Sequence, residues 1–227
     1  MEKKKINLDI VSDVACPWCY VGKKHIEQAL ANLDDYDVEV NWKPFQLDPT
    51  IPQEGLDRET YLVNKFGSLE NVDGMLSRLQ ETGSKVGINF DWMKRVPNTL
   101  RLHNLLHVAS KEGFSNELKE EFFKAYFEKV IDMSSEDEIN KIMSKFGWSA
   151  EKSKEVMSDE EISFAVNQDI REVQNRGVRG VPFFIINNQY GISGAQPPAV
   201  LEQWIKGAGE KIFESTTEVC DIDDPNC

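Results

Sequence analysis

The sequence predicts an α/β fold whose two parts are separated along the chain by an all-helical insertion. Residues 1–55 carry the pattern of a strand, a helix and a second strand, and residues 177–210 carry the pattern of two strands and a helix. Between them, residues 56–176 show apolar residues at the three- and four-residue spacing of helices. The chain has 227 residues, of which 40% are hydrophobic, so it is long enough to bury a full core without disulfide bonds.

In the first unit, residues 6–11 form an apolar-rich run typical of a strand, and helical periodicity extends over residues 20–31. Residues 37–43 alternate apolar and polar side chains, which indicates a second strand. A strand, a helix and a strand in this order predict a βαβ unit. A proline-rich loop, residues 44–55, then leads out of the sheet.

The insertion is expected to contain helices at residues 60–66, 71–83, 99–111, 116–131, 136–146 and 159–176. Capping residues support several of them. Ser135 and Ser158 each precede a glutamate by three residues in the capping-box arrangement, and Ser115 or Asn116 precedes the fourth helix. Other helices are expected to end near glycine residues, namely Gly113, Gly147 and Gly177.

The second unit begins with residues 180–193, which predict a hairpin, and continues with a helix at residues 197–206. With the helical block excised, the order βαβ then ββα is the thioredoxin topology. We therefore expect three parts. These are a thioredoxin-like domain at residues 1–55 and 177–210, an inserted helical domain at residues 56–176, and an acidic C-terminal tail at residues 211–227.

A pair of cysteines lies between the first strand and the first helix, in Cys16-Pro17-Trp18-Cys19. This position places Cys16 at the helix N-terminus, where unpaired N–H groups and the helix dipole favour a thiolate, so Cys16 is expected to be the nucleophile. Pro17 suits the first helical turn, where a missing N–H costs nothing. Cys19 follows within one turn, close enough for a disulfide to form and open. The motif therefore predicts dithiol redox chemistry.

Two other interpretations of the cysteine pair are disfavoured. A structural zinc site needs a second pair of soft ligands, and the remaining cysteines, Cys220 and Cys227, do not have the usual spacing of such a pair. Buried, inert cysteines are disfavoured because Pro17 and Trp18, at a strand-to-helix corner, indicate an exposed edge. We expect Trp18 to be partly exposed, and both Pro17 and Trp18 to contact substrate.

The charge and hydropathy of the chain limit its partners. There are 39 acidic and 26 basic residues, a net charge of −13, which disfavours nucleic acid because its binding depends on Lys and Arg. No apolar run is long enough to span a membrane, and no continuous apolar stretch of a signal peptide follows the lysine-rich start. We expect a cytoplasmic protein with neither nucleic acid nor membrane as a partner.

Two histidines, His103 and His107, lie four residues apart on one expected helix. This spacing can place two imidazoles on one side of a metal ion. Neither belongs to an HExxH motif, and no carboxylate at a third fixed spacing completes a ligand set. The sequence therefore predicts no metal site.

Three separated motifs follow one another along the chain, namely SDVACPWCYVG at residues 12–22, GVPFF at residues 180–184 and SGAQ at residues 193–196. In this combination the chain resembles the FrnE-like branch of the DsbA thiol oxidoreductase family, over about residues 8–205. The resemblance implies a thioredoxin fold with an inserted helical domain. It also implies activity on protein or small-molecule disulfides and dithiols.

The resemblance assigns roles to residues away from the cysteines. It implies that the Val181–Pro182 peptide bond is cis and that Pro182 packs against the cysteine motif. It also implies that the Val181 backbone pairs with an extended substrate as an added strand. Residues 98–103 resemble a segment at the start of a helix that faces the active site, so we expect His103 near the substrate groove.

The expected activity is thiol–disulfide exchange, in which Cys16 attacks a substrate disulfide and Cys19 resolves the mixed disulfide, or the steps run in reverse. A strongly oxidising pair would be held reduced by a cytosolic poise of about −220 to −320 mV, which favours reduction or isomerisation. No cofactor is expected beyond the cysteine pair, with glutathione as a candidate co-substrate.

Two alternatives from other classes remain. The fold resembles that of kappa-class glutathione transferases and hydroxychromene carboxylate isomerases, which generally use Ser, so the intact Cys16 and Cys19 argue against this alternative. The other is an adaptor or holdase whose thiols only report oxidation.

Cys220 and Cys227 flank a short acidic segment at the end of the chain. We hypothesise that this pair exchanges with the Cys16–Cys19 pair as an internal relay or a redox-sensing lid. The alternative is a chain end with two incidental thiols.

Overall fold

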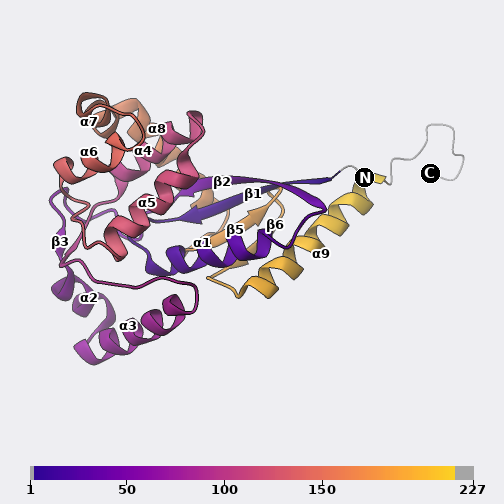
Figure 1. Ribbon diagram of the computed structural model, residues 1–227, viewed down its shortest axis with the longest axis horizontal. Helices are drawn as coiled ribbons and strands as arrows, with labels where there is room; N and C mark the ends of the chain where they lie inside the picture. Colours follow the sequence, from indigo (N-terminus) through magenta and orange to yellow (C-terminus); the bar gives the residue numbers. More distant parts are fainter. Residues whose placement is uncertain (1–2, 218–227) are drawn as a thin grey trace, which may run out of the picture.

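A four-stranded sheet with the strand order β2-β1-β5-β6 supports one half of the protein, in a computed structural model that describes residues 3–217 (Figure 1). Strands β1 and β2 are parallel, whereas β5 is antiparallel to both β1 and β6. The elements of this half are β1 (Lys4–Ser12), α1 (Pro17–Leu30), β2 (Tyr36–Pro44), β5 (Phe183–Ile186), β6 (Tyr190–Ser193) and α9 (Pro198–Thr217). This is the predicted thioredoxin topology.

The alternation of side chains along β1 sends apolar residues to both faces of the sheet. On one face, Leu8 and Ile10 pack in a core with Ile26 of α1 and Ile205 of α9. On the other face, Val11 packs with residues at the end of α8 and just beyond it. Burial on both faces explains why this strand is rich in β-branched residues.

The remaining helices gather beyond the end of the sheet where β1 and β2 finish (Figure 1). They are α2 (Arg58–Phe66), α3 (Leu69–Ser84), α4 (Leu100–Lys111), α5 (Ser115–Phe127), α6 (Glu136–Ser144), α7 (Ala150–Ser158) and α8 (Glu160–Asn175). All of them except α2 contribute to a large apolar core that also includes the start of α1. The two halves therefore meet at the cysteine motif.

The prediction that the insertion is all-helical was wrong in one detail. Two short strands, β3 (Leu56–Asp57) and β4 (Arg95–Val96), form an antiparallel pair inside it. Two-residue strands carry no periodicity that a sequence can show, because pairing alone defines them.

The helical boundaries also differ from the prediction in the last part of the insertion. Helix α7 was missed, although the Ser149 side chain caps it by accepting a hydrogen bond from the Lys152 N–H at 3.2 Å. Helix α8 is capped by Asp159 and not by the expected Ser158, which is the last residue of α7. At the start of α5, the expected Ser or Asn cap is replaced by Phe114, which makes no side-chain cap.

The C-terminal helix α9 is longer than the sequence suggested. It runs to Thr217, so residues 211–217 of the expected tail belong to a helix. Cys220 and Cys227 lie outside the described residues. Within residues 3–217, no helix is both long and apolar enough to cross a membrane.

Candidate active site

The cysteine motif lies at the start of α1, immediately after the loop that follows β1. Cys16 is the N-cap residue, with extended backbone angles φ −96° and ψ 111°, and Pro17 is the first residue of the helix. The Cys19 N–H donates a hydrogen bond to the Cys16 carbonyl at 3.0 Å, which closes the first turn. Both cysteines are free thiols. The sequence-predicted placement of the dithiol at a helix N-terminus is confirmed.

The prediction that this corner is an exposed edge was wrong for the cysteines themselves. Cys16 is 4% exposed and Cys19 is 1% exposed, because both belong to the core that they share with the inserted helices. Pro17 and Trp18 are half-buried, so Trp18 is partly exposed as expected. A partner must therefore approach the sulfur atoms over these two side chains.

The protonation of Cys16 also differs from the expectation based on the helix N-terminus. The hydrogen bond with the Cys19 thiol, and then burial, raise the pKa of Cys16 well above its ordinary value. The Cys19 backbone N–H in the first helical turn acts in the opposite direction, as expected, but does not outweigh them. The Cys16 thiol is therefore mainly protonated at neutral pH.

The third motif element is the Val181–Pro182 peptide bond, which is cis, as the resemblance implied. The Cys16 thiol lies 3.6 Å from the Val181 carbonyl oxygen and donates to it. Pro182 also lies against α1, since a Cβ atom built on Gly22 would be only 2.9 Å from Pro182 Cγ. Gly22 therefore allows the proline loop to approach the cysteine helix, a role that the sequence reasoning did not assign.

Asp13 is a buried carboxylate beside the motif that the sequence reasoning did not select. Its side chain accepts hydrogen bonds from the N–H groups of Leu47 at 2.7 Å and Ala15 at 3.3 Å. Burial opposes its ionisation, but hydrogen bonds from His103 and from the Leu47 N–H outweigh burial and lower the pKa of Asp13. The one available signal was an acidic residue at the end of an apolar strand, three positions before Cys16.

His103 lies beside Asp13 and does not lie on an open substrate surface, so its predicted place in a groove was wrong. It is 2% exposed, and its Nε2 atom is 2.9 Å from the Phe45 carbonyl and 3.5 Å from Asp13 Oδ1. A carbonyl only accepts, so Nε2 carries the proton. Burial, partly opposed by Asp13, lowers the pKa of His103, which is therefore neutral at pH 7. The imidazole supports the loop after β2.

The comparisons with known proteins agree with this geometry. A family model for the DSBA-like thioredoxin domain matches residues 7–206. The chain belongs to the DSBA-like thioredoxin domain family. A solved structure of a probable DsbA oxidoreductase from Streptomyces coelicolor is 33% identical, with a TM-score of 0.84 over 90% of this chain and 91% of that one.

Two further proteins resemble this chain, one in sequence and one in fold. The uncharacterized protein YwbO of Bacillus subtilis is 26% identical over 91% of this chain and 98% of its own length. A 2-hydroxychromene-2-carboxylate isomerase is 14% identical, with a TM-score of 0.69 over 95% of this chain and 100% of that one. This likeness shows that the chain and the isomerase have the same fold.

A small cavity of about 50 Å³ adjoins the motif of this DSBA-like domain. Ala15 and Pro17 line it together with the aromatic residues Trp92 and Phe127. The guanidinium of Arg58 lies 4.7 Å from the centre of the Trp92 ring. The inserted domain thus brings aromatic side chains from the loop before β4 and from α5 next to the cysteine motif.

A buried lysine of the inserted domain also lies close to the dithiol. Lys119 is 1% exposed, and its Nζ atom lies 5.4 Å from the ring centre of Trp42 and 5.3 Å from that of Phe123. Burial lowers its pKa to about 8, although the neighbouring Cys19, Asp13 and Cys16 oppose this. A lysine among the acidic residues of α5 gave no sequence signal of burial.

His103 and His107, the pair considered as a metal site, have different partners in the structure. His107 faces Asp169 at 3.9 Å, whereas His103 turns to Asp13 and the Phe45 carbonyl. Within residues 3–217, no group of three or more His, Cys, Asp or Glu side chains is arranged to hold a metal ion.

Proposed function

We propose that the protein is a thiol–disulfide oxidoreductase in which Cys16 attacks substrate disulfides and Cys19 resolves the product. The observation that carries this proposal is the 3.6 Å contact between the Cys16 thiol and the Val181 carbonyl, next to a cis-proline. That contact places the nucleophile beside a backbone edge that can pair with an extended chain. Membership of a DsbA-like family supports the same chemistry.

The exchange proceeds in two balanced steps. The Cys16 thiolate attacks one sulfur of a substrate disulfide, which forms a mixed disulfide and releases the other substrate sulfur as a thiolate. The Cys19 thiolate then attacks Cys16 Sγ, which forms the Cys16–Cys19 disulfide and releases the second substrate thiolate. Two electrons pass from the dithiol to the substrate, and the reverse sequence oxidises a dithiol.

The burial of the pair favours reduction or isomerisation as the net direction. A strong oxidant of the DsbA type owes its potential to a stabilised reduced form. Here the Cys19 thiol and burial raise the pKa of Cys16, so a stabilised thiolate does not hold the pair reduced. We expect a reduction potential well below the value of about −120 mV of DsbA. A potential near that value, measured in glutathione redox buffers, contradicts this direction.

Turnover tests the activity itself. Wild-type protein should accelerate both the reduction of insulin by dithiothreitol and the refolding of a scrambled disulfide protein, and Cys16→Ser should abolish both. Cys19→Ser should accumulate a mixed disulfide with the substrate, visible by mass spectrometry, because the resolving thiol is missing. Substrate binding that is retained in Cys16→Ser, without wild-type turnover, would support the adaptor alternative instead.

An assay with glutathione distinguishes the proposed oxidoreductase from the kappa-class transferase alternative. We propose glutathione as a co-substrate that reduces the Cys16–Cys19 disulfide, with release of oxidised glutathione. A kappa-type transferase would conjugate glutathione to an electrophile, and this activity would survive in Cys19→Ser. Oxidised glutathione as the product in wild type, with no conjugate, supports the oxidoreductase.

A further inference from the structure

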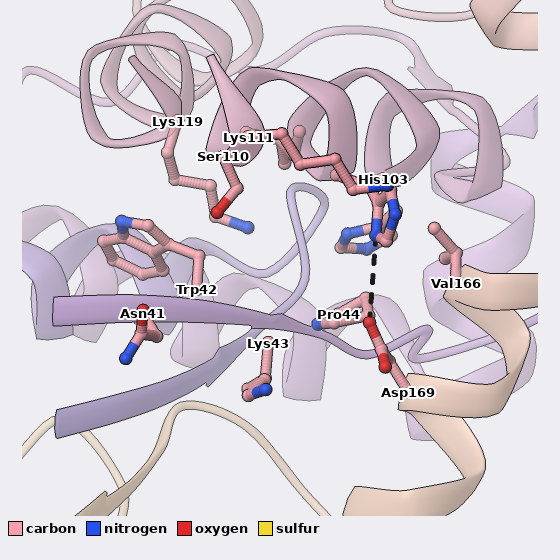
Figure 2. Close-up of a pocket in the computed structure, with 12 residues that line it drawn as sticks. Asn41, Trp42, Lys43, Pro44, His103, Ser110, Lys111, Lys119, Val166 and Asp169 are labelled. Atoms are coloured by element: carbon pink, nitrogen blue, oxygen red, sulfur yellow. Dashed lines mark ion pairs between the residues drawn. The ribbon is translucent and has the colours of Figure 1, made fainter. Parts of the chain in front are cut away.

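A second cavity of about 190 Å³ lies between β2 and the helices α4, α5 and α8. Figure 2 shows its walls, with Trp42 on β2, Lys119 and Ser110 reaching in from the helices on the opposite side, and Asp169 on α8. Neither cysteine lines this cavity.

The titratable side chains of this cavity are mainly basic, in a chain with a net charge of −13. Lys43, Lys111 and Lys119 line it, together with the two histidines of α4. The single carboxylate in the lining, Asp169, faces one of these histidines, His107, at 3.9 Å. No ion pair joins any of the three lysines to a carboxylate within residues 3–217.

Among these basic groups, Lys119 has the greatest need of a counter-charge because it is buried. Its ammonium lies over the faces of Trp42 and Phe123 and makes no hydrogen bond or ion pair within residues 3–217, although the charge of Asp13 also acts on it. A buried charge without a hydrogen-bonded counter-charge is costly. The cavity offers room for such a counter-charge next to Lys119. Asn41 and Ser110 add neutral groups that can donate hydrogen bonds to it.

We infer that this cavity binds a small oxyanion, in which phosphate or carboxylate oxygens accept hydrogen bonds from Lys119 at the buried end and from Lys111 at the rim. The volume of the cavity limits the size of the anion that it can hold. Pockets for drug-sized ligands and cofactors measure roughly 300–1,000 Å³, so about 190 Å³ suits an inorganic anion, a small dicarboxylate or one phosphate group.

Calorimetric titration tests the site with two probes, inorganic phosphate and malonate, at constant ionic strength maintained with chloride. At least one probe should bind with a stoichiometry of one. Lys119→Met should weaken binding by about tenfold or more, as expected for the loss of one charge-assisted hydrogen bond. Binding of phosphate alone assigns a phosphate site, and binding of malonate alone assigns a carboxylate site.

Two more variants make the result decisive. Lys111→Ala changes an exposed rim residue, poses little risk to folding, and should weaken binding several-fold. Lys141→Met is the matched control, because Lys141 is 69% exposed on α6 and pairs with Glu138, so binding should be unchanged. Absence of binding by both probes, or equal binding in wild type, Lys119→Met and Lys111→Ala, overturns the inference.

Discussion

Replacing Lys119 by methionine should stabilise the folded protein, because the lysine is a charge held in an apolar setting. Burial lowers its pKa from 10.5 to about 8. Each pH unit between these values corresponds to about 1.4 kcal/mol, so the buried ammonium costs about 3 kcal/mol at pH 7. Cation–π contacts with Trp42 and Phe123 offset about 1–2 kcal/mol of this. We expect a net gain of about 1–2 kcal/mol from Lys119→Met in the free energy of unfolding.

The pH dependence of this gain identifies its cause. At pH values below about 8, Lys119 is protonated in both the folded and the unfolded chain, so the full cost of burial applies. As pH rises from about 8 towards 10.5, the unfolded chain keeps a proton that the folded protein has released, so wild-type stability rises. At pH 9 the cost is about 2 kcal/mol, so the advantage of Lys119→Met should shrink by about 1 kcal/mol between pH 7 and pH 9.

Urea denaturation at pH 7 and pH 9 measures both quantities. The comparison should be made in buffers without phosphate, and in a Cys16→Ser/Cys19→Ser background so that thiols do not titrate in the same range. Lys141→Met serves as the exposed control, with an expected change within about 0.5 kcal/mol. A Lys119→Met variant that is less stable than its parent by the same amount at both pH values would refute the reasoning, because the ammonium would then contribute no burial cost.

Three other predictions follow from contacts in the same region. Gly22→Ala places a Cβ atom 2.9 Å from Pro182 Cγ, and the overpacking cost of about 1–3 kcal/mol should exceed the helix-propensity gain of about 1 kcal/mol. Its denaturation midpoint should fall, and an unchanged midpoint argues against this close contact. His103→Leu removes a buried donor from a backbone carbonyl and should cost about 1–3 kcal/mol by the same assay, whereas a neutral effect contradicts the assigned hydrogen bond. Burial raises the pKa of Glu120, but the hydrogen bond from Lys24 and neighbouring lysine charges outweigh it and hold the pKa near 2. Glu120→Gln should therefore be less stable than wild type above pH 4.5, with a difference that disappears as pH falls to about 2, and acid titration of stability checks this.

Local patterns determined much of what the sequence could reveal. An apolar-rich run identified β1, alternation identified β2, and helical spacing identified most of the inserted helices. The order of the elements predicted the thioredoxin topology that the sheet shows. The position of Cys16 and Cys19 between a strand and a helix was also readable. These features depend on neighbours a few residues apart, and the chemistry of a CxxC pair at a helix start follows from that local geometry.

The surroundings of the Cys16–Cys19 pair depend on the tertiary structure alone. Cys16 is buried because helices from a distant part of the chain cover it, and this burial helps raise the pKa of Cys16 that the helix N-terminus alone would lower. Asp13 lies three positions before Cys16, but His103 and Lys119 come from two separate helices, so no spacing in the sequence shows that these two residues lie near the dithiol. Burial, charge pairing and cavities arise from the path of the whole chain, whereas the sequence records only the preferences of each segment.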